Sequence, residues 1–158
     1  MGLGAGESAG GEGYQSPAGS VRLEQVIQAP ADRVAEYISD FRNSGDWMVG
    51  VEDVEALGDD SYRVRLDTPV GKLEPGVRVT RRGEASISWV YTSTVEGGGE
   101  VEISPMPDGC NVLYSGNFRL KRKLLGRAAR LAGVERFAHR NGERSLTRLK
   151  ALMEAERY

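Results

Sequence analysis

Apolar side chains at every second position, interrupted at short intervals by turn-forming residues, fill the middle of this chain. The segment Ile87-x-Trp89-x-Tyr91 shows the alternation, and Pro107-Asp108-Gly109 is one of the turns between such segments. A period of two with short connections predicts strands that pair with their chain neighbours in antiparallel fashion. We expect six strands between residues 51 and 118 and a seventh over 21–28. A sheet of seven strands is expected to curve as it twists.

Helical patterns lie on both sides of the six strands. Over 31–41 the apolar residues recur at the spacing of one helix face, namely at Val34, Tyr37, Ile38 and Phe41. Pro30 suits the start of this helix, and a short second helix or turn is expected over about 43–48. Beyond Leu120 the pattern predicts a short helix at 121–131 and a long one at 134–156. Only the long terminal helix can cover the concave side of the sheet, which makes the fold class α+β.

Trp47 and Met48 stand in a short link between the helical start and the strands, directly after four turn-forming residues. A surface loop of this length would not normally carry so large an aromatic side chain. We expect both residues to plug the end of the curved sheet, beneath the small helices. Their predicted role is core packing, without a part in chemistry.

The 158 residues fit one domain. Residues 1–20 are rich in glycine and lack an apolar run, so a disordered tail is expected there and a single domain over 21–158. With no signal peptide and no apolar run near 18 residues, we expect a cytoplasmic protein. The single cysteine, Cys110, cannot form an internal disulfide, and with His139 as the single histidine we expect no metal and no cofactor.

The net charge of −2 conceals an asymmetry along the chain. Residues 1–118 contain nine Lys and Arg against 19 Asp and Glu, whereas residues 119–158 contain 12 against four. The simpler interpretation is a basic helix that lies on its own acidic sheet. The alternative is a surface for an anionic membrane, a nucleic acid or an acidic partner.

Two stretches carry a resemblance to a known group of proteins. One contains Ala29-Pro30, Val34, Asp40-Phe41 and Trp47-Met48 leading into Val51, and the other is NGERSLTRLKALME near the end. In this order the chain resembles, over about 21–156, the SRPBCC superfamily, which has the START and polyketide-cyclase-like helix-grip fold. The resemblance implies a ligand-binding domain with a deep cavity between sheet and terminal helix for an apolar or aromatic small molecule. It implies no catalytic residue.

The inward stripe of the terminal helix is small in its middle. A helical projection places Ala138, Gly142, Ser145 and Leu149 on one face, with larger residues towards the C-terminus. A tightly packed core would need bulk at the small positions, so they are candidates for lining a ligand cavity. The alternative is that Trp89 or Tyr114 of the sheet fills this space.

Aromatic residues of the strands supply the other candidate cavity wall: Trp89, Tyr91, Tyr114 and Phe118. Hydroxyl and imidazole groups that could orient a ligand are those of Tyr62, Tyr91, Tyr114 and His139. His139 projects to the edge of the helix stripe, where it is either a base at the cavity mouth or a surface residue. The sequence leaves the direction of Glu74, Arg78 and Arg119 open. No catalytic triad, Cys/His arrangement or carboxylate pair can be assigned.

Three functions follow from these observations. The first is binding of a small hydrophobic or aromatic ligand in the internal cavity, with no nucleic acid as partner. The second is a cyclase or dehydratase-type enzyme that uses the same cavity. The third is an accessory protein that docks through residues 121–131, where Lys and Arg alternate with leucines in a pattern suited to weak contact with an anionic membrane or acidic partner.

Overall fold

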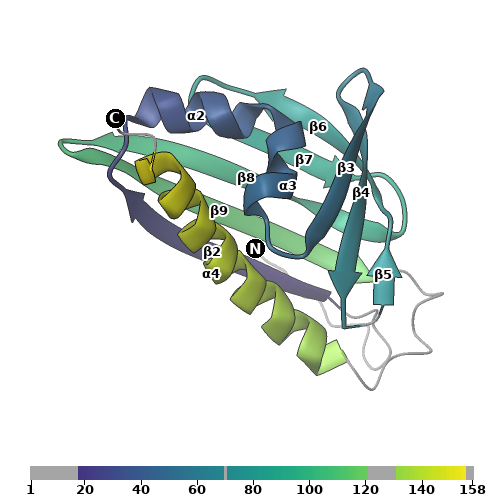
Figure 1. Cartoon of the computed structure of the whole chain (residues 1–158). Coiled ribbons are helices and arrows are strands. Elements are labelled where there is room, and N and C mark those ends of the chain that lie inside the picture. Colours follow the sequence, from purple (N-terminus) through teal and green to yellow (C-terminus); the bar gives the residue numbers. More distant parts are fainter. Residues whose placement is uncertain (1–17, 70, 121–130, 156–158) are drawn as a thin grey trace, which may run out of the picture.

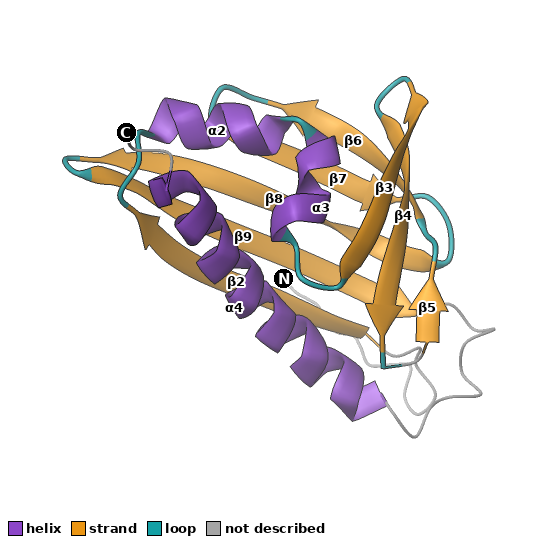
Figure 2. Cartoon of the chain, viewed as in Figure 1, coloured by secondary structure: helices purple, strands orange, loops and turns teal. Residues whose placement is uncertain are grey.

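A curved antiparallel sheet holds a long C-terminal helix against its concave face (Figures 1 and 2). The computed structural model describes residues 18–69, 71–120 and 131–155. The strands are β2 (Ala18–Ile27), β3 (Val51–Gly58), β4 (Ser61–Thr68), β5 (Gly71–Leu73), β6 (Gly76–Arg82), β7 (Ser86–Tyr91), β8 (Val95–Met106) and β9 (Gly109–Leu120). The helices are α2 (Ala31–Ser39), the 3-10 helix η1 (Phe41–Asn43), α3 (Ser44–Trp47) and α4 (Leu131–Ala155).

The sheet has the strand order β2-β9-β8-β7-β6-β4-β3, with every pair antiparallel. The chain neighbours β2 and β3 lie at opposite edges, and α2, η1 and α3 make the crossing between them. In Figure 1, α4 runs diagonally across the part of the sheet formed by β2 and β9. The predicted α+β helix-grip architecture is thereby confirmed.

One of the predicted strands is divided into two in the structure. Leu73, Val77 and Val79 belong to one of the six strands that the alternation predicts between residues 51 and 118, but in the structure β5 and β6 are separate and both pair with β4. Pro75 lies between them and has no N–H to give to the ladder, while its carbonyl accepts from the N–H of Val64 at 3.0 Å. The sheet therefore has eight strands among the described residues instead of the seven expected.

The helices begin and end close to their predicted positions. The carbonyl of Pro30 accepts the N–H groups of Arg33 and Val34, each at 3.1 Å, and α2 follows from Ala31. The strand β2 starts at Ala18, three residues before the expected start. Residues 1–17 of the expected tail and 121–130 of the expected short helix lie outside the described residues.

The core gathers aromatic rings beneath the small helices. Trp47 is 3% exposed, which confirms its prediction as a buried side chain. Phe41 of η1 contacts Tyr62 and Trp89, with ring centroids 5.0 and 5.5 Å apart. Residues of α4 complete the core from above, and Leu149 is fully buried. These contacts fix the end of the sheet against which a cavity can form.

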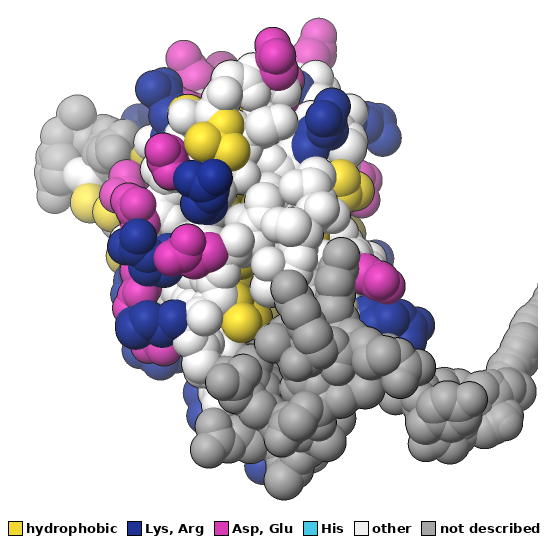
Figure 3. Space-filling model, turned by 90° about the vertical axis from the view of Figure 1, so that its right-hand side faces the viewer, with side chains coloured by type: hydrophobic (Ala, Val, Ile, Leu, Met, Phe, Trp, Pro, Cys, Tyr) yellow, Lys and Arg dark blue, Asp and Glu magenta, His cyan; other side chains and the backbone are white. Residues whose placement is uncertain are grey.

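The basic helix α4 does lie on the sheet, as the simpler interpretation of the charge asymmetry expects, and it makes this contact through its apolar face. Its arginines at every fourth position are exposed, and they are Arg136, Arg140, Arg144 and Arg148. Within the sheet, several acidic side chains pair with basic side chains of neighbouring strands. On the side of β3, β4 and β5, acidic and basic side chains are interspersed (Figure 3), and Glu55 pairs with Arg63 at 2.9 Å.

No helix of the described segments is long and apolar enough to cross a membrane.

Candidate functional site

Two adjoining hollows lie between α4 and the concave face of the sheet. The first, of about 140 Å³, reaches Leu73, Val95 and Phe118, and we name it the Phe118 lobe. The second, of about 160 Å³, reaches Trp47 and Met48, and we name it the Trp47 lobe. Six residues line both lobes, namely Leu66, Thr68, Tyr91, Tyr114, Phe137 and Ala138. The two lobes therefore lie side by side, and we name the six residues that they share the waist.

The waist carries two phenols, those of Tyr91 on β7 and Tyr114 on β9. Both side chains are half-buried, and burial raises the pKa of each above its ordinary value. The neighbouring Tyr91 raises the pKa of Tyr114 further. Both groups therefore keep their protons at neutral pH and are available as hydrogen-bond donors.

Gly116 makes room for one of these hydroxyls. A Cβ atom at Gly116 would lie 3.0 Å from the hydroxyl oxygen of Tyr114, closer than ordinary packing allows. A side chain at this position would therefore push the Tyr114 hydroxyl away from its place along β9. Among the described residues, neither Tyr91 nor Tyr114 donates its hydroxyl hydrogen to a protein acceptor.

Trp89 lies behind the cavity and lines neither lobe, contrary to the expectation from its sequence position. Its side chain is 4% exposed and stacks on Tyr114, with ring centroids 6.4 Å apart and planes at 23°. Its paired residue on β8 is Gly99, where any Cβ atom would collide with the indole ring. Trp89 therefore supports the phenol of Tyr114 from the core side.

The α4 residues that were candidates for the cavity wall lie in two different places. Ala138, Gly142 and Ser145 line the Trp47 lobe, whereas Leu149 packs in the core and lines neither lobe. A Cβ atom at Gly142 would come within 2.6 Å of the Leu23 side chain on β2. The gap at Gly142 is therefore used mainly for close approach of helix to strand, which corrects the expectation that it leaves open space.

Comparison with known proteins places this architecture in a family. The family model described as polyketide cyclase/dehydrase and lipid transport matches residues 18–154. The chain belongs to this family. No curated protein sequence matched the chain.

Solved structures share the fold of this polyketide cyclase/dehydrase family member at low sequence identity. A protein from Thermus thermophilus is 18% identical, with a TM-score of 0.72 over 88% of this chain and 99% of that one. An aromatase/cyclase from Streptomyces sp. R1128 is also 18% identical, with a TM-score of 0.66 over 87% and 94%. A START superfamily protein from Mycobacterium smegmatis is 13% identical, with a TM-score of 0.57 over 87% and 97%.

Two polar candidates lie away from the cavity of this family member. Tyr62 packs on Phe41, and its hydroxyl accepts a hydrogen bond from Arg82 at 3.4 Å. The His139 side chain is 54% exposed, with Nδ1 3.9 Å from a carboxylate oxygen of Glu143, and it lines neither lobe. The geometry makes His139 a surface residue and not a base at the cavity mouth.

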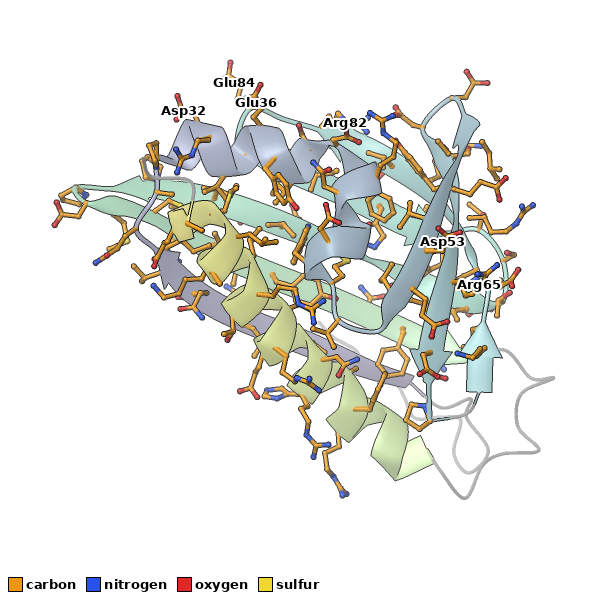
Figure 4. All side chains as sticks on the ribbon, in the orientation of Figure 1. Asp32, Glu36, Asp53, Arg65, Arg82 and Glu84 are labelled. Atoms are coloured by element: carbon orange, nitrogen blue, oxygen red, sulfur yellow. The ribbon has the colours of Figure 1, made fainter. Side chains whose placement is uncertain are left out.

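Charged side chains also point away from the cavity. The sequence leaves open the direction of three charged side chains. In the structure these three, Glu74, Arg78 and Arg119, are exposed and do not line the cavity. The charged groups labelled in Figure 4 lie around the outside of the fold: Asp32, Glu36, Asp53, Arg65, Arg82 and Glu84. The described residues that line the two lobes include one carboxylate, the exposed Asp67 of the Trp47 lobe, and no Lys, Arg or His.

Sequence reasoning missed several residues of the wall, chiefly Leu66, Phe137 and Asn141. Phe137 lies well outside the projected stripe of α4, yet it lines both lobes because the curved sheet also reaches the flank of the helix. One signal was present, since Phe137 is the only Phe, Tyr or Trp in α4. A large aromatic on a supposedly exposed flank indicates a partner surface.

The described residues offer no cluster of three His, Cys, Asp or Glu that could hold a metal ion. Cys110 is fully buried, and burial raises the pKa of its thiol, so it is not a reactive thiolate. What the site can do chemically is enclose an apolar molecule and donate hydrogen bonds to it from two phenols.

Proposed function

We propose that this protein binds one small apolar or aromatic molecule in the cavity between its sheet and α4. The observation that carries the proposal is the cavity wall: two lobes with mainly apolar linings that meet at a pair of phenols. Small-molecule sites are typically apolar with a few placed polar groups, and they begin at about 300 Å³. The two lobes together reach that size. The family description, which includes lipid transport, supports an apolar ligand.

A cyclase or dehydratase activity in the same cavity is the second candidate. The family description and the aromatase/cyclase neighbours favour it. Tyr91 and Tyr114 could donate protons in such a reaction. A base that removes a proton is harder to find, because the described lining residues include no histidine and one carboxylate, Asp67, which is exposed. Binding without turnover is therefore the function that the wall supports best.

Uptake of N-phenyl-1-naphthylamine, an uncharged fluorescent probe, tests the binding proposal. We expect saturable uptake with a blue-shifted emission. Ala138→Phe fills the waist and should weaken the affinity at least about tenfold, because Ala138 lines both lobes. Ala151→Phe is the matched control, since Ala151 is exposed on the same helix. No saturable uptake by the wild type, or equal uptake by both variants, would contradict the proposal.

Docking on an anionic membrane is the third candidate, and one observation favours it. The exposed arginines of α4 named above form no ion pair with any described residue. They continue the basic segment 121–131, of which 121–130 lie outside the described residues. Attraction near anionic lipid is about 1 kcal/mol per Lys or Arg and falls with salt.

Co-sedimentation with phosphatidylserine vesicles at low salt examines this candidate. Changing Arg136, Arg140, Arg144 and Arg148 together to Gln should abolish recovery. The matched control removes the same charge from the sheet by changing Arg63, Arg65, Lys72 and Arg78 to Gln, and it should retain recovery. Equal recovery with phosphatidylcholine vesicles, or recovery with neither lipid, would rule the membrane contact out.

A further inference from the structure

The polar and apolar parts of the cavity wall are arranged in a definite order. At one end, Leu73, Val95 and Phe118 give the Phe118 lobe an apolar wall. At the other end, Trp47 and Met48 do the same for the Trp47 lobe. Tyr91 and Tyr114 belong to both linings and therefore lie between the two ends. A molecule that filled both lobes would place its middle against the two phenols.

Within the described part of the chain, these phenols are donors without an acceptor. No described residue accepts the hydroxyl hydrogen of Tyr91 or of Tyr114. A polar hydrogen that loses water when a ligand enters needs a new acceptor, because leaving it unpaired is unfavourable. A purely hydrocarbon ligand would leave two such donors unpaired. An acceptor atom in the ligand would satisfy them.

The charges in the cavity lining limit which acceptor groups a ligand can carry. Among the described residues no Lys, Arg or His lines either lobe, so these residues give a buried carboxylate or phosphate on the ligand no counter-charge. Asp67, the one carboxylate among the described lining residues, is exposed, lines the Trp47 lobe alone and does not belong to the waist. The waist thus favours an uncharged acceptor.

From this arrangement we infer that the ligand has two apolar parts joined by an uncharged hydrogen-bond acceptor, a carbonyl group, which lies between Tyr91 and Tyr114. The inference rests on the proposed function, since it describes the molecule that the cavity would hold. It extends that function by naming the ligand class: an uncharged diaryl or arylalkyl ketone or a related carbonyl compound. The phenols act as binding groups that set specificity.

Benzophenone and diphenylmethane provide a matched pair of probes, because they differ only in the central group, a carbonyl in one and a methylene in the other. Isothermal titration should give a Kd for benzophenone at least about tenfold below that for diphenylmethane. Tyr114→Phe and Tyr91→Phe should each reduce this preference, and the double variant should remove it, with diphenylmethane affinity unchanged. Tyr37→Phe is the control, because its hydroxyl donates to Asp46 at 3.3 Å and it lines neither lobe.

The infrared carbonyl stretch of bound ¹³C-benzophenone gives a second measurement that needs only the wild-type protein. A hydrogen-bonded carbonyl should absorb at lower wavenumber than the same ¹³C-benzophenone dissolved in hexane. A frequency equal to that in hexane would overturn the inference. Equal affinity for the two probes, or a preference that survives in the double variant, would also overturn it while leaving the proposed function intact. Saturable binding of neither probe nor of the naphthylamine would instead overturn the proposed function itself.

Discussion

The hydroxyl of Ser145 on α4 accepts a hydrogen bond from the backbone N–H of Val49, 2.8 Å away and 96 residues earlier in the chain. The same hydroxyl donates to the carbonyl of Asn141 at 2.6 Å. The side-chain amide of Asn141 donates in turn to the carbonyl of Val49 at 3.1 Å. Both backbone groups of Val49 are therefore bound by α4. This contact closes the loop between α3 and β3 over the Trp47 lobe.

Ser145→Ala should loosen that closure. The change leaves the N–H of Val49 without its partner, and an unsatisfied buried donor costs about 1–3 kcal/mol. We expect that loss in urea unfolding, together with faster release of the naphthylamine probe. Thr147→Ala is a suitable control, because Thr147 is exposed on the same helix and bonds only within it, to the carbonyl of Glu143. Comparable effects of both variants would show that the Val49 contact has no special role.

Gly142→Leu should destabilise the fold. A side chain at this position meets Leu23 at once and then Tyr114, whose ring lies 3.6 Å from an ideal Cβ. Overpacking of this kind typically costs about 1–3 kcal/mol. Adding Leu23→Ala should recover part of the loss, because it removes the nearest atom. If Gly142→Leu left the free energy of unfolding unchanged, helix α4 would not approach β2 as closely as described.

Much of the fold could be predicted from the sequence because period two and period 3.6 are strong, local signals. The helix over 31–41, the strand series and the terminal helix all follow from them. The cavity could be predicted less well. Trp89 and Tyr91 lie on the same face of β7, and period two cannot separate them. What separates them is the cross-strand partner: Gly99 lets the indole of Trp89 fold into the core.

The helix side of the cavity shows the same limit. A projection finds Gly142 but cannot tell empty space from close backbone approach, because that depends on Leu23 in a distant strand. It also excludes Phe137, since it assumes a flat partner surface. The curvature of the sheet is a property of all eight strands together and leaves no local mark on α4.

Trp47→Ala should cost about 3–5 kcal/mol, the range for truncating a large core side chain. Trp47 is 3% exposed and also forms the end wall of the Trp47 lobe. Leu57→Ala is the comparison, because Leu57 is 49% exposed and should change stability little. Urea unfolding of both variants measures the difference. A loss below about 1 kcal/mol for Trp47→Ala would mean that this ring is not part of the core.

The waist phenols should make stability fall at alkaline pH. Burial raises the pKa of Tyr114, and of Tyr91, in the folded protein, whereas an unfolded tyrosine titrates near pH 10. A group whose folded pKa is raised stabilises the fold fully below the unfolded pKa, and this contribution is lost as pH rises above it. The free energy of unfolding should therefore decline above about pH 10, and the decline should be smaller in Tyr114→Phe.

Tyr37→Phe, whose hydroxyl lies outside the cavity, should follow the wild type. Urea unfolding at about pH 8 and about pH 10.5, on either side of the unfolded pKa, measures both slopes. Identical slopes for the two variants would show that the Tyr114 phenol is freely solvated.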